Sequence, residues 1–80
     1  MILYVSRTCG ACGKLLQLLV QMPRVLAATD IRILDGNERA QLEAHELGIR
    51  MTPALVVATP DGRRMVYQGP QASQALVAMA

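Results

Sequence analysis

The sequence has no phenylalanine and no tryptophan, and it has only two tyrosines among its 80 residues. Its eight basic residues are scattered, and Arg63 and Arg64 are their only adjacent pair. Nucleic-acid binding usually needs a concentrated basic face together with aromatic side chains that stack on bases. Since neither feature is present and the net charge is only +2, we expect no nucleic-acid partner.

Long hydrophobic runs are also absent, and none approaches the roughly 20 residues that a membrane-spanning helix requires. We therefore expect no membrane partner. Residues 1–5 are apolar from the start, without the basic stretch and cleavage site of a signal peptide. The default expectation is a cytoplasmic protein, and in that compartment a close cysteine pair is more often catalytic or metal-binding than structural.

The length is sufficient for one domain, so we expect residues 1–80 to form a single folded unit. Hydrophobic residues make up 52% of the chain, which argues against disorder. Because so short a chain buries a small core, its margin of stability should be narrow. With few aromatic residues, Leu, Val, Ile, Ala and Met must supply most of that core.

Hydrophobic periodicity predicts strands and helices in alternation. The expected strands are residues 1–5, 31–34, 54–58 and 63–68, and the expected helices are residues 10–22, 37–47 and 71–80. Strand 31–34 alternates apolar and basic residues, which suits one exposed face, whereas strand 54–58 has no charged residue and should be buried on both faces. The order β-α-β-α-β-β-α indicates an α/β protein with a four-stranded mixed sheet flanked by helices. The first two strands should be parallel, and the last two should form an antiparallel hairpin.

Turn and cap residues mark the ends of these elements. Pro23 is expected to end the first helix, because proline disrupts a helix interior. Asn37 fits the N-cap of the second helix. Gly48 fits the left-handed position after the last turn of that helix, and Ile49 fits the apolar contact that often accompanies it. Residues 59–62, Thr-Pro-Asp-Gly, indicate the turn of the hairpin.

The only two cysteines, Cys9 and Cys12, lie directly after the first expected strand and at the start of the first expected helix. Backbone N–H groups at a helix N-terminus carry partial positive charge, so they stabilise a thiolate and lower its pKa. Cys9 should lie where this effect is largest, and Cys12, one turn further along, should be more covered. This position predicts thiol–disulfide exchange, in which Cys9 attacks a substrate disulfide and Cys12 then resolves the mixed disulfide.

The two intervening residues fit this chemistry. Gly10 removes side-chain bulk beside the nucleophile and allows the backbone to bend tightly. Ala11 is a strong helix former that adds no polarity. Both residues are therefore expected at the surface that a substrate contacts.

Three other interpretations of the cysteine pair stay open at this stage. A zinc site within one chain needs four ligands, and the two cysteines with the distant His45 supply three, so we expect no metal held in this way. A buried, inert pair is the second interpretation. The third is a metal or iron–sulfur cluster shared between two chains, which together would supply four thiolates. We assign His45 itself no catalytic role.

Thr52 and Pro53 precede strand 54–58, and by themselves they indicate an ordinary trans proline at the start of a strand. Together with the Cys-Gly-Ala-Cys motif, however, residues 48–55 (GIRMTPAL) resemble the thioredoxin–glutaredoxin superfamily. The similarity in motif order covers nearly the whole chain, including the glycine, Gly69, that precedes the last expected helix.

This resemblance implies a thioredoxin fold in which Pro53 is cis and packs beside the cysteine pair. It also implies that the backbone of Thr52 pairs with a bound peptide or glutathione as an added strand. Met51 either lines an apolar contact surface with Ala11 or belongs to the core. We therefore expect the substrate-binding residues to include Met51, Thr52, Pro53, Gly10 and Ala11.

The sequence also departs from the family pattern. Thr8 stands where thioredoxins usually have tryptophan, and Ala11 replaces the proline or aromatic residue of the usual motifs. The acidic residue that thioredoxins bury beneath the motif would fall near Leu3, so that proton acceptor is absent. Arg7, by charge, and Gln71, by hydrogen bonding, are candidates to hold a glutathione carboxylate, with solvated surface as the alternative.

The leading prediction is an enzyme, a disulfide reductase that resembles thioredoxin and glutaredoxin and acts on protein or small-molecule disulfides. We expect no bound cofactor, with NADPH-derived electrons supplied by glutathione or by a flavoprotein such as thioredoxin reductase. We expect a monomer whose partners are disulfide-containing proteins and one of these donors. The alternatives on the same fold are a carrier of a metal or iron–sulfur cluster through Cys9, and a non-catalytic interaction module.

Overall fold

The computed structural model describes residues 1–79 and contains one mixed sheet of four strands, in the order β2-β1-β3-β4. The strands are β1 (Ile2–Val5), β2 (Asp30–Ile33), β3 (Ala54–Ala58) and β4 (Arg64–Gln68). β1 and β2 are parallel, and β3 runs antiparallel to both of its neighbours. The predicted mixed sheet, with its parallel first pair and its final hairpin, is confirmed.

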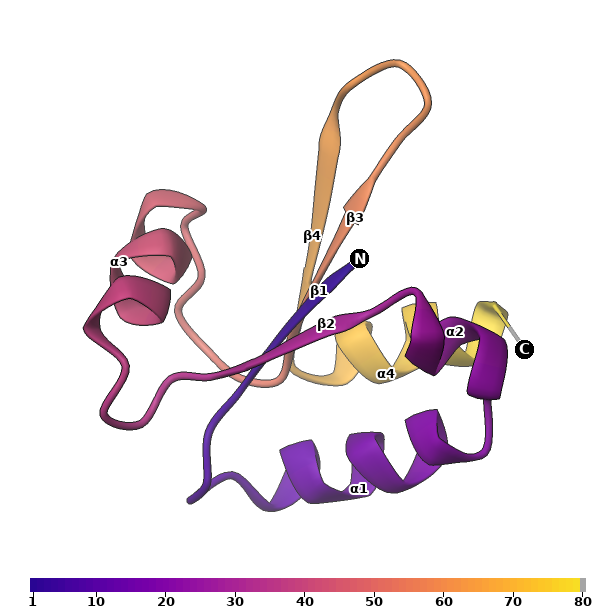
Figure 1. Cartoon of the computed structure of the whole chain (residues 1–80), viewed down its shortest axis with the longest axis horizontal. Coiled ribbons are helices and arrows are strands. Elements are labelled where there is room, and N and C mark those ends of the chain that lie inside the picture. The colour runs from indigo at the N-terminus through magenta and orange to yellow at the C-terminus, as the bar shows by residue number, and fades with distance from the viewer. Residues whose placement is uncertain (80) are drawn as a thin grey trace.

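Helices cover both faces of the sheet. The helices are α1 (Gly10–Val20), α2 (Pro23–Ala27), α3 (Glu38–Glu46) and α4 (Pro70–Ala78). Figure 1 shows α1, α2 and α4 on one side of the strands and α3 on the other. Ala80, the last residue of the final predicted helix, lies outside the described residues. No helix within residues 1–79 is long and apolar enough to span a membrane.

Side chains alternate between the two faces of each central strand, and this alternation builds two apolar clusters. In β1, Leu3 and Val5 point to one face and Tyr4 to the other. The cluster beneath α1 and α4 contains Leu3, Val5, Cys12, Leu15, Leu19, Leu55, Ala72 and Leu76. The cluster beneath α3 contains Tyr4, Ala40, Ala44, Ala54 and Val56. Aliphatic side chains thus supply most of the core, as expected, and Cys12 belongs to it.

The predicted ends of α3 are confirmed by their hydrogen bonds. The Asn37 side chain accepts a hydrogen bond from the N–H of Ala40 over 3.1 Å, as an N-cap residue does. Gly48 has a φ of +75°, in the left-handed region that favours glycine. The N–H of Ile49 donates to the carbonyl oxygen of Ala44 over 2.9 Å, which closes the last turn.

Pro23 follows the end of the first helix, as predicted, but it also has a second role that was not predicted. The first helix ends at Val20, before the proline, and Pro23 begins the additional helix α2. A proline at the first helical position loses no hydrogen bond, and its fixed φ suits the helix. Met22, Val25 and Leu26 pack against the cluster beneath α1, so tertiary contacts stabilise this short helix.

The burial predicted for two strands is only partly correct. β3 is buried at Ala54, Leu55 and Val56, but Val57 is half-buried and Ala58 is exposed. The reason is visible in Figure 1, where the β3–β4 hairpin extends beyond the helices. β2 was expected to bury its apolar side chains, yet its isoleucines are exposed because β2 lies at an edge of the sheet.

Candidate active site

Cys9 and Cys12 form a disulfide at the N-terminus of α1, with their Cα atoms 5.2 Å apart. Cys9 is the N-cap residue, with an extended backbone (φ −98°, ψ 108°). Its Sγ accepts a hydrogen bond from the N–H of Cys12 over 3.1 Å. An N-cap side chain normally offers an oxygen to the first free N–H groups of a helix. Here sulfur takes that place, so the helix N-terminus acts directly on Cys9.

The electrostatics at this helix end favour a negative charge on Cys9. The first turn of α1, all of it within the described residues, carries no acidic side chain. The partial positive charge of the helix N-terminus is therefore not opposed by a neighbouring carboxylate within that turn. The N–H of Cys12 points at Sγ of Cys9, the position from which a helix N-terminus stabilises a thiolate.

Cys12 has very different surroundings from Cys9. Its side chain is 2% exposed and lies within the apolar cluster beneath α1 and α4, whereas Cys9 is half-buried. Leu3 belongs to the same cluster. By the resemblance, thioredoxins bury an acidic residue near this position. No polar or charged residue is buried in the part of the chain that the structure describes. The predicted difference between an accessible and a covered cysteine is confirmed.

The peptide bond between Thr52 and Pro53 is cis and lies beside the cysteine pair, as the resemblance implied. The carbonyl oxygen of Thr52 is 3.6 Å from Sγ of Cys9. Pro53 is buried, and its carbonyl oxygen accepts a hydrogen bond from the N–H of Gly69 over 2.8 Å. This bond ties the proline segment to the end of β4 and so fixes the backbone next to the disulfide.

Met51 lies at the surface rather than in the core. Its side chain is 53% exposed and crosses Gly69, where an added Cβ would stand 3.1 Å from the Met51 sulfur. The side-chain oxygen of Gln68 accepts hydrogen bonds from the N–H groups of Arg50 (2.7 Å) and Met51 (3.3 Å). The segment before Thr52 is thus held against the end of β4, and the adaptable thioether of Met51 is exposed.

Gly10 and Ala11 are exposed on the first turn of α1, which agrees with the predicted contact surface. The predicted need for glycine at position 10, however, is not supported. Its φ lies outside the left-handed region, and an added Cβ would meet nothing within 4 Å. Gly10 leaves the approach to Cys9 open, but the backbone does not require it.

A groove of about 500 Å³ opens beside Thr52. Its walls come from the loop before Cys9, the connection after β2, helix α3 and the segment before Thr52. The lining residues are Ser6, Leu34, Asp35, Gln41, Ala44, His45, Ile49, Arg50, Met51 and Thr52. The groove therefore extends from the backbone next to the disulfide toward α3, and it is large enough for several side chains of a bound partner.

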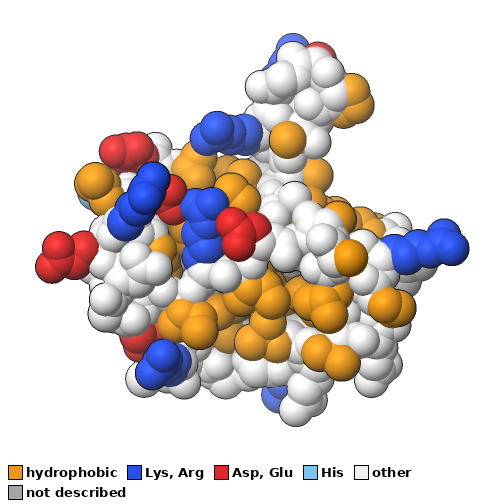
Figure 2. Space-filling view, in the orientation of Figure 1, with side chains coloured by type: hydrophobic (Ala, Val, Ile, Leu, Met, Phe, Trp, Pro, Cys, Tyr) orange, Lys and Arg blue, Asp and Glu red, His pale blue; other side chains and the backbone are white. Residues whose placement is uncertain are grey.

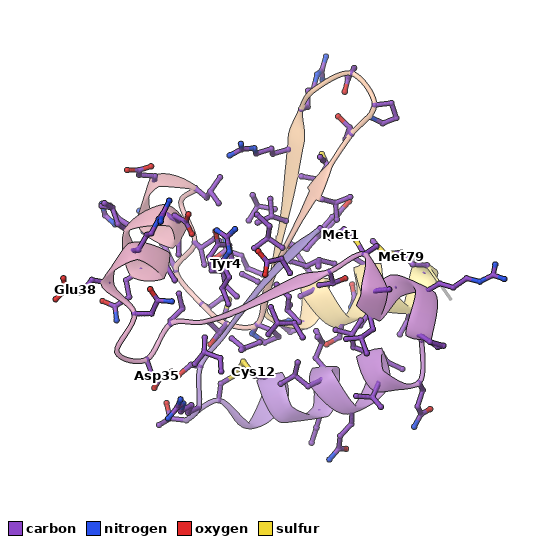
Figure 3. All side chains as sticks on the ribbon, viewed as in Figure 1. Met1, Tyr4, Cys12, Asp35, Glu38 and Met79 are labelled. Atoms are coloured by element: carbon purple, nitrogen blue, oxygen red, sulfur yellow. A yellow bond between two sulfur atoms is a disulfide. The ribbon has the colours of Figure 1, made fainter. Side chains whose placement is uncertain are left out.

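Arg7 contributes through its backbone. Its N–H donates a hydrogen bond to a carboxylate oxygen of Asp35 over 2.9 Å, and this bond is the main reason why the pKa of Asp35 is lowered from its ordinary value of 3.8. The contact joins the loop before Cys9 to the connection after β2, and Figure 3 shows Cys12 and Asp35 at the same end of the molecule. Neither residue predicted to hold a glutathione carboxylate lines the groove: Arg7 is not among the lining residues, and Gln71 lines a separate hollow with Met65.

Asp35 and His45 line the groove, although the sequence pattern assigned neither of them to a site. Asp35 follows β2, which is parallel to β1, and β1 leads into the cysteine motif. Because the carboxyl ends of neighbouring parallel strands meet at one edge of a sheet, this signal was present in the sequence. His45 had no comparable signal.

The comparisons with known proteins leave the site to be interpreted from its geometry. No family model, no curated protein and no solved structure matches the chain. Within residues 1–79, no three His, Cys, Asp or Glu side chains lie close enough together to hold a metal ion.

Proposed function

We propose that this protein is a thiol–disulfide oxidoreductase with a thioredoxin-like fold. One observation carries the proposal: Cys9 Sγ lies at a helix N-terminus, bonded to the sulfur of Cys12 and 3.6 Å from the carbonyl oxygen of Thr52. This arrangement joins a half-buried sulfur at a helix N-terminus to a covered partner sulfur and to the backbone of Thr52. These are the three parts that disulfide exchange with a peptide requires.

The architecture supports the same proposal. A β1-α1-β2 unit with parallel strands is followed by α3, an antiparallel hairpin and a last helix, and a cis proline begins β3 beside the cysteines. This is the order that the thioredoxin–glutaredoxin resemblance implies. The additional helix α2 lies between α1 and β2, away from the cysteine end of α1.

The proposed reaction starts from the reduced protein. The Cys9 thiolate attacks one sulfur of the substrate disulfide, and the other sulfur leaves as a thiolate that takes up a proton. Cys12 then loses its proton and attacks Sγ of Cys9. This step forms the Cys9–Cys12 bond and releases the second substrate thiolate, so the two electrons gained by the substrate come from the two protein thiols.

Two thiols of an external donor must then reduce the Cys9–Cys12 disulfide. Two glutathione molecules, which become glutathione disulfide, or a flavoprotein reductase such as thioredoxin reductase would supply these electrons. We propose that the protein substrate lies along the groove that Thr52 lines, where the substrate backbone can pair with the backbone of that residue. Met51 would then contact apolar side chains near the substrate disulfide.

Trapping experiments test the proposal. The Cys12→Ser variant is expected to form a stable mixed disulfide with a disulfide-containing peptide, because no resolving thiol remains, and mass spectrometry should place the link on Cys9. The Cys9→Ser variant is the matched control and should form no such adduct, since Cys12 is covered. Equal labelling of both variants, or labelling of neither, would refute the proposed roles.

Turnover assays identify the donor. NADPH consumption is measured in two assays, one that contains glutathione and glutathione reductase and one that contains thioredoxin reductase. Each assay is run with the unmodified protein and with the Cys9→Ser variant. An absorption spectrum of freshly purified protein separates the alternative function, because an iron–sulfur cluster absorbs visible light. We expect turnover that depends on Cys9 and no visible absorption.

A further inference from the structure

The outer edge of β2 carries features that are typical of a strand-pairing surface. β2 is the last strand on its side of the sheet, and among the described residues only β1 pairs with it. Exposed edges tend to pair with another strand unless a very short strand, charged side chains (lysine above all), proline, a bulge or a covering element prevents it. Residues 30–33, with the sequence DIRI, contain no lysine or proline.

The backbone hydrogen bonds show which groups are free. The N–H of Asp30 donates to the carbonyl oxygen of Met1 (2.8 Å), and the N–H of Leu34 donates to that of Val5 (2.9 Å). In a strand that pairs on one side, alternate residues direct their N–H and C=O groups toward the partner. The peptide groups of Ile31 and Ile33 therefore point to the outer edge, away from β1.

The side chains of the same two residues are apolar and exposed. Ile31 is 37% exposed and Ile33 is 38% exposed. They lie beside Leu3 and Val5 in the strand register, so they face the side of the sheet that α1 covers. Figure 2 shows a band of hydrophobic side chains next to a group of basic and acidic side chains.

The charged residues of β2 lie on the opposite face and alternate in sign. Arg32 forms ion pairs with Asp30 (3.0 Å) and with Glu43 of α3. The Asp30 side chain remains 61% exposed. A strand that carries an acid and a base two residues apart is complementary to an antiparallel copy of itself.

We propose that two copies of this chain associate through β2, antiparallel, with Ile31 opposite Ile31 of the second copy. In this register the two isoleucines exchange both of their free backbone hydrogen bonds, and Asp30 of each copy lies opposite Arg32 of the other. A register centred on Arg32 would place the two arginines directly opposite each other, and like charges in that position are destabilising.

The two-fold axis of such a pair is perpendicular to the sheet, so the isoleucines of both copies form one apolar strip on the same face. The product is a continuous eight-stranded sheet, counted as two copies of the four strands. Because only a short strand is shared, the interface is smaller than the roughly 1,600 Å² of a standard complex. We therefore expect reversible association in the micromolar range, which revises the expectation of a monomer.

Sedimentation equilibrium of the full chain, from micromolar to millimolar concentration and with reductant present, tests the proposal. The unmodified protein and the Cys9→Ser variant should both dimerise, which excludes dimers linked by intermolecular disulfides. Ile31→Lys should weaken association by at least about tenfold, because it removes the apolar contact and sets two like charges face to face. Met65→Lys is the matched control on β4, the opposite edge, where Met65 is 45% exposed, and it should leave association unchanged.

Asp30→Lys keeps the test decisive if Ile31→Lys does not fold, as judged by circular dichroism. Asp30 is solvent-exposed, and its replacement sets lysine opposite Arg32 in the proposed register, so it should also weaken association about tenfold. A monomeric unmodified protein over the whole range would overturn the proposal. Dissociation by Met65→Lys alone, or a folded β2 variant that associates as tightly as the unmodified chain, would overturn it as well. None of these results depends on whether the cysteines are catalytic.

Discussion

The N–H of Cys12 donates a hydrogen bond to Sγ of Cys9 over 3.1 Å, so the covered cysteine supports the half-buried one through its backbone. The same residue thereby has two proposed roles. Its backbone stabilises charge on Cys9, and its side chain later resolves the mixed disulfide. A Cys12→Ser substitution removes the second role but keeps the first, which makes this variant informative about the state of Cys9.

The first prediction concerns the acidity of Cys9. In the Cys12→Ser variant, alkylation of Cys9 by iodoacetamide should rise with pH at a midpoint below the value of about 8.5 for a free cysteine, because the helix N-terminus stabilises the thiolate. The rate is measured across a series of buffers. Cys12, measured in the Cys9→Ser variant, should react far more slowly because it is 2% exposed. A Cys9 midpoint equal to that of free cysteine would contradict the proposed activation.

The second prediction concerns Gly69, whose φ of +59° and ψ of −130° are rarely adopted by other residues. Gly69→Ala should lower the free energy of unfolding by about 1–3 kcal/mol through backbone strain, with a further loss from the contact with Met51. Urea unfolding of Gly69→Ala, Met51→Ala and the double variant separates the two effects. In the double variant, Met51→Ala should restore only the part of the free energy of unfolding that Gly69→Ala loses through the contact with Met51. Complete recovery would show that backbone strain contributes nothing.

The third prediction concerns Tyr4, which is 1% exposed in the core beneath α3. Burial, followed by the charge of Glu43, raises the pKa of its phenol above the ordinary value of 10.0. The unfolded chain therefore loses this proton first, so the stabilisation is full below pH 10 and is lost as the pH rises through the folded-state pKa. Urea unfolding at increasing alkaline pH measures the loss.

Tyr4→Phe should flatten this alkaline dependence, and Tyr67→Phe is the control that should retain it, since Tyr67 is only half-buried on β4. If the two variants lost stability in parallel above pH 10, the alkaline effect would not come from Tyr4.

Most of the architecture could be predicted because its signals are local. The alternation around Tyr4 in β1, the cap at Asn37 and the glycine at position 48 each act within a few residues. The missed helix α2 has five residues, too few to be stable alone, and it forms because Val25 and Leu26 pack against the core. Such a helix depends on tertiary contacts that periodicity does not describe.

The residues of the candidate site likewise include some that the sequence predicts and some that depend on the tertiary structure. Cys9, Cys12 and the Thr52–Pro53 bond belong to two motifs whose spacing is visible in the sequence, and the structure brings the motifs together. Asp35 and His45 reach the groove only because β2 lies next to β1 and α3 follows it. The exposure of the β2 isoleucines likewise depends on strand order, which the sequence order does not determine.

The last prediction tests whether the groove holds protein substrates. His45→Trp should raise the KM for a protein disulfide about tenfold, equivalent to roughly 1.4 kcal/mol of lost binding, because indole would occupy part of the groove that His45 and Thr52 both line. A small-molecule disulfide needs only Cys9 and its immediate surroundings, so its kcat/KM should not change. Leu42→Trp is the control, since Leu42 is 59% exposed on the same helix and does not line the groove. If both tryptophan variants raised the KM equally, or if His45→Trp slowed both substrates, the groove would not be the site that distinguishes proteins from small disulfides.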